Sequence, residues 1–149
     1  MSDAQPTLTS LPQILASRER VSAPQVRFSV PADWLQGRTT FGGLLSALAV
    51  QAMRDVCGSN WPLRALQTNF VGPVAVGHFD VEVTLLRQGK NIRQVQARVL
   101  QSQADGQPQV CGVLLGVFGT GRESALPFIR PAQPTVQRTA EQAAVWPYI

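Results

Sequence analysis

Two adjacent glycines, Gly42 and Gly43, stand where a long apolar segment begins, and the sequence predicts that this segment is a helix. The first amides of a helix have no acceptor within it and carry the positive end of the helix dipole. Because glycine has no side chain to block them, these two amides are suited to polarise the oxygen of a bound carbonyl group. In the alternative interpretation, the glycines only permit close packing at the helix entrance.

Two amide side chains on a predicted strand form a second candidate. Gln67 and Asn69 are two residues apart in the sequence, so they share one face of the strand. Together they could hold a water molecule. The alternative is that each is a surface or interface residue.

A basic turn is the third candidate. Gly89, Lys90 and Asn91 form a tight turn that is flanked by Arg87 and Arg93. Loop amides and cationic side chains both favour anions. The turn is therefore a candidate contact for phosphate groups, with an ordinary basic turn as the alternative.

Histidine-based and metal-based chemistry have little support. His78 is the only histidine, and Cys57 and Cys111 are far apart in the sequence. A Ser/His/Asp triad would have to be built around that one histidine, and no cluster of residues has metal-ligand spacing. We expect no metal site and two reduced, buried thiols.

A helix over residues 43–56 must present the two glycines. Thr39 or Thr40 is available to cap its start, and Gly58 can end it. Its apolar residues cover nearly the whole circumference instead of one stripe. We therefore expect this helix to be enclosed.

Four strands are predicted after the helix. Apolar and polar residues alternate over 65–70, 78–85 and 94–99, and the run 110–118 is apolar on both faces. Alternation predicts half-buried strands, and the continuous run predicts a central one. Glycine-rich turns between them indicate an antiparallel meander.

The whole chain predicts a single α+β domain, in which a long central helix is wrapped by a curved antiparallel sheet of about five to six strands. The 149 residues divide into a core of about 25–122, a covering helix over 8–16 and an extended tail over 123–149. A strand over 27–30 and a loop over 32–40 precede the central helix.

Composition narrows the function classes. Hydrophobic residues make up 44% of the chain and charged residues 15%, and the net charge of +4 is scattered instead of clustered. The sequence therefore gives little support for nucleic-acid binding, whereas a small polyanionic ligand suits such a surface. The first ten residues are polar, and no apolar run approaches the roughly 20 residues of a membrane span. We expect a cytoplasmic protein that does not cross a membrane.

The order of these elements resembles the hotdog-fold acyl-CoA thioesterase superfamily, and most closely the N-terminal hotdog repeat of TesB-type acyl-CoA thioesterases. The matching stretches, in order, are 39–45, 69–73, 81–90 and 94–99. The resemblance implies a hotdog fold and an acyl-CoA thioester substrate. Coenzyme A is then part of the substrate, and no separate cofactor is implied.

Assembly follows from the same resemblance. TesB-type enzymes look like two hotdog repeats fused in one chain, whereas this chain has room for one. A homodimer or higher homo-oligomer is thus implied. The alternative is a monomer whose own termini cover the second face of the sheet.

The resemblance and the chemistry of the candidate residues together suggest roles for particular residues. Gln36 is near the position where related enzymes place a glutamine against the thioester. The thioester carbonyl would then sit on the Gly42 and Gly43 amides, with a water aligned by Gln36 or Asn69. The phosphates of coenzyme A would meet Arg87, Gly89, Lys90 and Asn91.

The sequence departs from the family where catalysis is concerned. Related single-domain enzymes carry a histidine just before the glycine pair and a carboxylate nine positions later, where this chain has Phe41 and Val50. The Asp, Ser/Thr and Gln set of the second TesB repeat falls on Val50, Leu63 and Leu114. An acyl-CoA thioesterase-like hydrolase is the leading interpretation. The alternatives are a non-catalytic acyl-CoA or acyl-chain binding protein and a subunit that needs a partner chain for its acid.

Overall fold

The structure of the chain is a computed structural model that describes residues 8–58, 60–102, 104, 106–127 and 130–145. The polar segment 1–7 and the last four residues of the predicted tail lie outside the described residues. The strands are β1 (Glu19–Ser22), β2 (Gln25–Val30), β3 (Leu35–Gln36), β4 (Thr39–Thr40), β5 (Leu63–Phe70), β6 (Gly77–Gln88), β7 (Ile92–Ser102) and β8 (Pro108–Gly119). The helices are α1 (Leu11–Ala16), the 3₁₀ turn η1 (Ala32–Trp34), α2 (Gly42–Cys57) and the 3₁₀ turn η2 (Ala140–Gln142).

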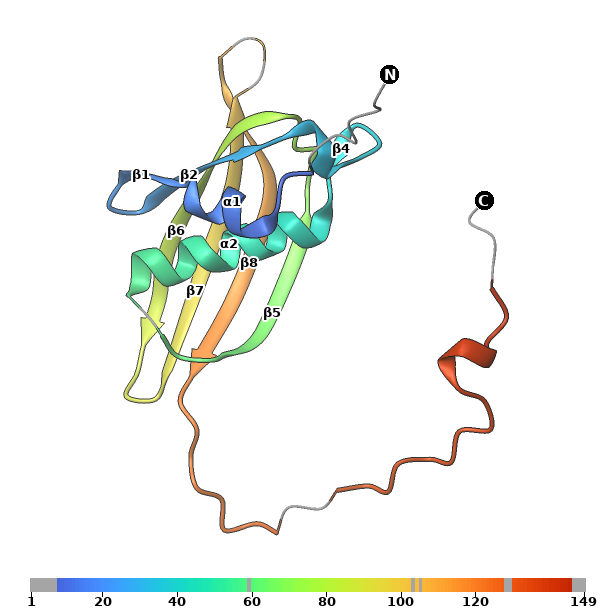
Figure 1. Ribbon diagram of the computed structural model, residues 1–149. Coiled ribbons are helices and arrows are strands. Elements are labelled where there is room, and N and C mark those ends of the chain that lie inside the picture. Colours follow the sequence, from blue (N-terminus) through green and yellow to red (C-terminus); the bar gives the residue numbers. More distant parts are fainter. Residues whose placement is uncertain (1–7, 59, 103, 105, 128–129, 146–149) are drawn as a thin grey trace.

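Six strands form one open antiparallel sheet in the order β1-β2-β6-β7-β8-β5, and α2 lies across one face of it (Figure 1). This arrangement confirms the predicted α+β hotdog architecture. The sequence did not predict β1, a four-residue strand that is exposed throughout. Strand β8 pairs with β7 on one side and with the edge strand β5 on the other, so it is an interior strand as predicted.

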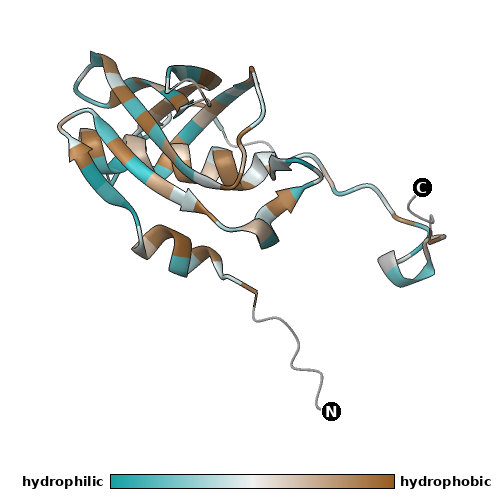
Figure 2. Ribbon diagram, turned by 90° about the horizontal axis from the view of Figure 1, so that it is seen from above, coloured by the Kyte–Doolittle hydropathy of each residue, from teal (hydrophilic) through white to brown (hydrophobic). Residues whose placement is uncertain are grey.

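Alternation along the strands builds the core on the helix side of the sheet. Phe79, Val81 and Val83 of β6 are buried, whereas the residues between them face outward. The same banding of polar and apolar residues runs along the neighbouring strands (Figure 2). The outer face is not covered, since Leu115 of β8 remains 39% exposed there.

Helix α2 is enclosed on one side only, which corrects the prediction. Its buried residues, which face the sheet and α1, are Leu44, Leu45, Leu48, Ala49, Ala52 and Met53. Gly43 and Ala47 are exposed, and Val50 is half-buried. The sheet covers one side of α2, and the short α1 contributes only one buried residue, Ile14, so a stripe of the helix stays open.

The caps of α2 differ from the prediction at one end. Gly58 ends the helix as predicted, in the left-handed conformation with φ 57°. At the start, Phe41 is the N-cap and offers no side-chain hydrogen bond. Thr39 and Thr40 lie in β4 instead, where both hydroxyls bond the backbone of Val74.

The terminal segments lie outside this core. Helix α1 begins at Leu11, three residues later than predicted, because Ser10 donates its backbone N–H to the Gln13 side chain at 2.7 Å and so starts the first turn. After β8 the chain runs away from the domain (Figure 1), and Leu126 is 80% exposed.

In the part of the chain that the structure describes, no helix has the length and apolar character to cross a bilayer.

Candidate functional site

A hollow of about 620 Å³ opens at the start of α2. It brings together three of the predicted site residues, Gln36, Gly42 and Gly43. Most of the remaining wall is apolar or uncharged, and consists of Thr39, Thr40, Phe41, Leu45, Phe70, Val71, Gly72 and Pro73. An acyl group would meet a largely apolar surface there.

Gln36 reaches this hollow because residues 35–40 form a small hairpin. Strand β3 pairs with β4 through Leu35 with Thr40 and Gln36 with Thr39. The backbone carbonyl of Trp34 accepts the Phe41 N–H at 3.0 Å, which ties the hairpin to the helix start. The sequence predicted only a loop here, because strands of two residues are too short to show an alternating pattern.

The amides of Gly42 and Gly43 are free for a ligand. The Thr40 N–H donates to Val74 and the Phe41 N–H to Trp34, but no described residue accepts from either glycine amide. The first bond back along the helix is from Leu45 to the Phe41 carbonyl, at 3.1 Å. Two donors with the positive end of the dipole therefore face the hollow.

The two glycines also have a packing role. A Cβ added at Gly42 would lie 2.7 Å from Cζ of Phe70, and one at Gly43 would lie 2.5 Å from Cε1 of Phe41. Both rings rest on the helix backbone although they are 60% and 47% exposed. Close packing and open amides are therefore both present, and the two interpretations of the glycines do not exclude each other.

A pair of hydroxyls beside the hollow was not singled out from the sequence. Ser46 Oγ donates to the Gly42 carbonyl at 2.9 Å and lies 3.4 Å from the hydroxyl of Thr68. Ser46 stands four residues after Gly42 and is the one polar residue of the apolar run 44–50, which was the available signal. The pair links α2 to the edge strand β5.

Asn69 is not part of this hollow. Its neighbour Phe70 packs on Gly42, so Asn69 points to the opposite, outer face of the sheet. There its side-chain amide donates to the Val113 carbonyl at 3.3 Å, and Gln67 lies beside it. Within one chain, Asn69 and the glycine amides are on different faces of the sheet, contrary to the predicted grouping.

The basic turn lies at the other end of α2. Arg93, which follows the turn at the start of β7, donates from Nη1 to the carbonyl of Cys57 at 2.7 Å. Gly42 and Cys57 are the first and last of the 16 residues of α2, which separates the two ends by about 24 Å. Arg87, Gly89, Lys90 and Asn91 therefore do not meet Gly42 and Gly43 within one chain.

Arginine side chains close the C-terminal end of α2. Arg93 stacks on the Trp61 ring with its guanidinium carbon 4.7 Å from the centroid. Arg20 donates to the Asp55 carbonyl at 2.8 Å, and Arg54 to the Trp61 carbonyl at 3.4 Å. Burial raises the pKa of the Cys57 thiol, and the charge of Arg93 acts in the opposite direction.

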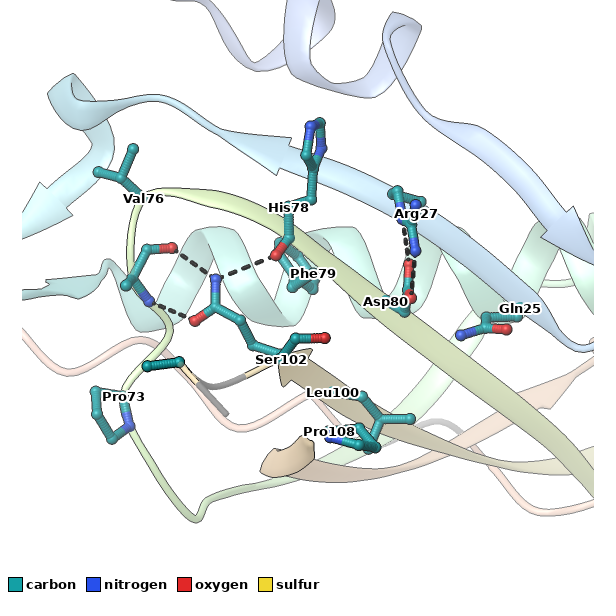
Figure 3. A pocket seen from close by; sticks show the side chains of 13 residues that line it. Gln25, Arg27, Pro73, Val76, His78, Phe79, Asp80, Leu100, Ser102 and Pro108 are labelled. Carbon is teal, nitrogen blue, oxygen red and sulfur yellow. Dashed lines mark hydrogen bonds and ion pairs between the residues drawn. The ribbon is translucent and has the colours of Figure 1, made fainter. Parts of the chain in front are cut away.

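A second hollow, of about 580 Å³, contains a serine, a histidine and an aspartate, which are the residue types of a triad (Figure 3). Asp80 is paired with Arg27 through bonds of 2.7 and 2.9 Å. The ring of His78 points away from the Ser102 hydroxyl. These three residues therefore do not form a triad. Across the described residues, no three histidine, cysteine or carboxylate side chains gather where they could hold a metal.

The model of one protein family, described as the acyl-CoA thioesterase N-terminal domain, matches residues 30–119. This range begins at the end of β2, ends at the last residue of β8 and includes the whole hollow at the start of α2. None of the curated proteins matches the chain.

Solved structures share the fold at low sequence identity. One is a conserved protein of unknown function with a hotdog fold from Alicyclobacillus acidocaldarius, with a TM-score of 0.72 at 22% identity over 90% of this chain and 48% of its own. Another is the PaaI protein from the phenylacetic acid degradation operon of Escherichia coli, with 0.55 at 21% identity over 65% and 72%. A third, BH2602 from Bacillus halodurans, was solved with CoA and gives 0.53 at 18% identity over 64% and 66%.

The chain spans about half the length of the structures it matches over most of its own residues. For the protein from Alicyclobacillus the covered share is 48%, and for a candidate thioesterase II from Thermobifida fusca it is 45%, with a TM-score of 0.69 at 18% identity over 86% of this chain. One copy of the present fold thus corresponds to one half of those proteins.

Proposed function

Because this chain belongs to the acyl-CoA thioesterase N-terminal domain family, we propose that it hydrolyses an acyl-CoA thioester to the free acid and CoA. The observation that carries the proposal is the pair of free amides of Gly42 and Gly43 in a largely apolar hollow. Donors that are already aimed at the site of developing negative charge stabilise it without reorganisation.

The proposed reaction uses this geometry directly. The thioester oxygen accepts hydrogen bonds from the Gly42 and Gly43 amides, and the acyl group lies against Phe41, Phe70 and Leu45. Gln36, on the same wall, orients a water that adds to the carbonyl carbon. The C–S bond then breaks and one proton of the water passes to the departing sulfur, so that CoA leaves as the thiol and the acid keeps the oxygen and the other proton of the water. Asn69 of the same chain faces away, so the water-positioning role rests on Gln36.

Removal of one amide tests the proposal. Gly42 is the first residue of α2, where proline fits the helix and lacks only the N–H. Phe41 already has ψ 124°, within the range that a residue before proline adopts. We expect Gly42→Pro to lower kcat by about 10²-fold or more, as other losses of an oxyanion donor do. Steady-state rates with thiol detection across short, long and aromatic acyl-CoAs provide the measurement.

Gly42→Ala is the matched control, since it adds a similar Cβ near Phe70 but keeps the amide. We expect it to lower turnover through displacement of that ring, and by much less than the proline. Equal losses in the two variants would show that ring packing, and not the amide, matters at this position.

One observation favours a second function, binding of acyl-CoA without hydrolysis. The described wall of the hollow contains no histidine and no carboxylate, and Val50 occupies the helix position where related enzymes carry an acid. Calorimetric binding of CoA esters together with no turnover across the panel would favour this function over hydrolysis.

We further propose that a second copy of the chain completes the site. Strand β5 is an open edge of the sheet, and Leu66 and Phe70 are exposed on it, at 37% and 60%. An open, apolar edge of this kind is a template for pairing with another chain. The half-length match to larger hotdog proteins supports the same assembly. A partner, either a copy or a different hotdog chain, could then also supply an acid.

Two lysine substitutions at equally exposed leucines test this assembly. Leu66 on β5 is 37% exposed and Leu115 on the outer face is 39% exposed. We expect Leu66→Lys to give a monomer and Leu115→Lys to leave the dimer intact in sedimentation experiments. A wild-type monomer at working concentration would contradict the proposed dimer. Contact of phosphates with Arg87, Gly89, Lys90 and Asn91, closeness to TesB-type enzymes and a cytoplasmic location stay predictions.

A further inference from the structure

Pro73 stands where three hollows of the surface meet. It lines the hollow at the start of α2, a second of about 620 Å³ beside Arg38, and the hollow of about 580 Å³ that contains Arg27 and Asp80. The first two also share Thr39, and the last two share Ala75. A path along the surface therefore leads from the free glycine amides, past Arg38, to the far side of the segment 71–76.

The segment 71–76 that this path follows is firmly held. Val71 and Gly72 donate their N–H groups to the Cys111 carbonyl at 2.9 and 3.0 Å. Gln101, which is 8% exposed, binds the N–H and the carbonyl of Ala75 with its side-chain amide, at 2.8 and 3.0 Å. With Val74 bonded to both threonines of β4, the wall between the hollows is a fixed surface.

Arg38 places a positive charge midway along the path. It follows Gly37 in the turn of the β3–β4 hairpin, the same hairpin that carries Gln36. Among the described residues no carboxylate lies within ion-pair distance of the exposed Arg38 side chain. A guanidinium without an acid partner is available to a phosphate.

The hollow beyond Arg38 combines polar groups with flat apolar surface. The Arg27 guanidinium uses two of its nitrogens on Asp80, which leaves further N–H groups unused in that contact (Figure 3). Gln25 and Ser102 add an amide and a hydroxyl, and Leu100 and Pro108 supply the apolar wall. Such a mixture suits a heterocyclic base with its ribose.

We propose that the nucleotide end of the CoA ester lies on this path, with a phosphate on Arg38 and the base and ribose in the hollow lined by Arg27, Gln25 and Ser102. The inference rests on the proposed function, because the thioester must sit at Gly42 and Gly43. It replaces the basic turn at Arg87 and Lys90 as the phosphate contact within one chain. That turn precedes Arg93, which bonds the Cys57 carbonyl at the other end of α2, the negative end of the helix dipole.

Two substrates with the same acyl group test the inference on the full chain. An acyl-CoA carries the nucleotide, and the corresponding acyl-pantetheine does not. We expect Arg38→Gln to lower kcat/KM for the CoA ester about 10-fold, the effect of one lost charged hydrogen bond. The acyl-pantetheine should react at the wild-type rate. Arg87→Gln and Lys90→Gln provide the matched comparison, and the inference expects each of them to lower kcat/KM for the CoA ester by less than Arg38→Gln does.

The outcomes separate the two proposals. Loss of the CoA preference in Arg87→Gln or Lys90→Gln, but not in Arg38→Gln, would overturn the inference and leave hydrolysis intact. If neither ester is hydrolysed, the proposed hydrolysis fails, and calorimetric binding of adenosine 3′,5′-bisphosphate tests the path directly. Binding that Arg38→Gln and Ser102→Val both weaken supports the path. No binding, or binding that only the basic turn affects, overturns it. Equal thermal midpoints of variants and wild type exclude misfolding as the cause.

Discussion

Helix α2 ends in a set of bonded carbonyls and begins with a pair of free amides. At its C-terminal end Gly58 turns the chain, and Arg93 and Arg20 donate to the carbonyls of Cys57 and Asp55. At its N-terminal end Phe41 supplies no side-chain cap, and the Gly42 and Gly43 amides have no acceptor among the described residues. Both ends of a helix leave unsatisfied backbone groups, and here only one end is closed.

The difference agrees with the proposed function, which places the ligand at the end of α2 that has no side-chain cap. A capping side chain at a helix start typically stabilises a protein by about 1 kcal/mol, and threonines that could have supplied it stand directly before Phe41. Both threonines bond Val74 instead, which fixes the wall of the hollow. The closed end is bonded within the fold, and under the proposed function the open end keeps its donors for a ligand. The following substitutions test that division.

The largest effect on stability is expected from removal of the Arg93 contacts at the C-terminal end of α2. Arg93→Ala removes the bond to the Cys57 carbonyl and the stacking on Trp61. From typical values for charged hydrogen bonds and cation–π contacts, we expect a loss of about 2 kcal/mol in the free energy of unfolding. Urea denaturation measures it. Arg87→Ala, on an exposed arginine with no partner among the described residues, is the control and should change stability by less than about 0.5 kcal/mol.

A smaller loss is expected at the C-cap itself. Gly58 has φ 57°, a backbone conformation that costs a side-chain-bearing residue roughly 1 kcal/mol. Gly58→Ala should lower the free energy of unfolding, measured by urea denaturation, by that amount without changing the hollow at Gly42. Gly121→Ala, where an added Cβ would meet nothing within 4 Å, is the control. If the two alanines had equal effects, the turn at Gly58 would not be what ends α2.

A side-chain cap at the start of α2 should raise the free energy of unfolding and lower turnover. An aspartate at position 41 can accept from the first amides of α2 and complement the dipole, so Phe41→Asp should be more stable than Phe41→Ala by about 1 kcal/mol. Turnover should be lower in Phe41→Asp than in Phe41→Ala, because its carboxylate occupies the donors that the thioester needs. Urea unfolding and steady-state rates measure the two sides. Equal stability of both variants would mean that the amides are already satisfied in the folded protein.

The sequence was informative where a period extends over several turns or pairs. The alternation in 78–85 predicted β6 with its buried Phe79, Val81 and Val83, and the helix 43–56 was correct to within one residue at each end. Strands β1 and β3 escaped prediction because segments of four and two residues carry no measurable period. Enclosure of α2 was overestimated because its composition does not reveal how far the sheet and α1 reach around it.

Part of the hollow at the start of α2 was predictable from the sequence. Gly42 and Gly43 were identified because a helix start gives free amides a fixed direction. The alternation over 65–70 already set Asn69 on the strand face opposite Phe70, and the structure shows that Phe70 is the one that packs on Gly42. Arg38 was not predicted as a phosphate contact. Its position beside Pro73 depends on the β3–β4 hairpin and on hollows formed by segments that are distant in the sequence.

The smallest expected effect is a pH dependence from the two cysteines. Burial raises the pKa of the Cys57 and Cys111 thiols, against weaker lowering by the Arg93 charge at Cys57 and by a backbone hydrogen bond at Cys111. The folded protein therefore keeps thiol protons that the unfolded chain releases above about pH 8.5. Stability from this source is complete below that pH and falls as the pH rises through it.

Urea midpoints between pH 7 and 10 should fall less steeply in Cys57→Ser and Cys111→Ala than in the wild type. Of the two, Cys57→Ser reports on the closed end of α2, because burial at that end raises the pKa of the Cys57 thiol. An unchanged slope in that variant would show that water already reaches the C-terminal end of the helix.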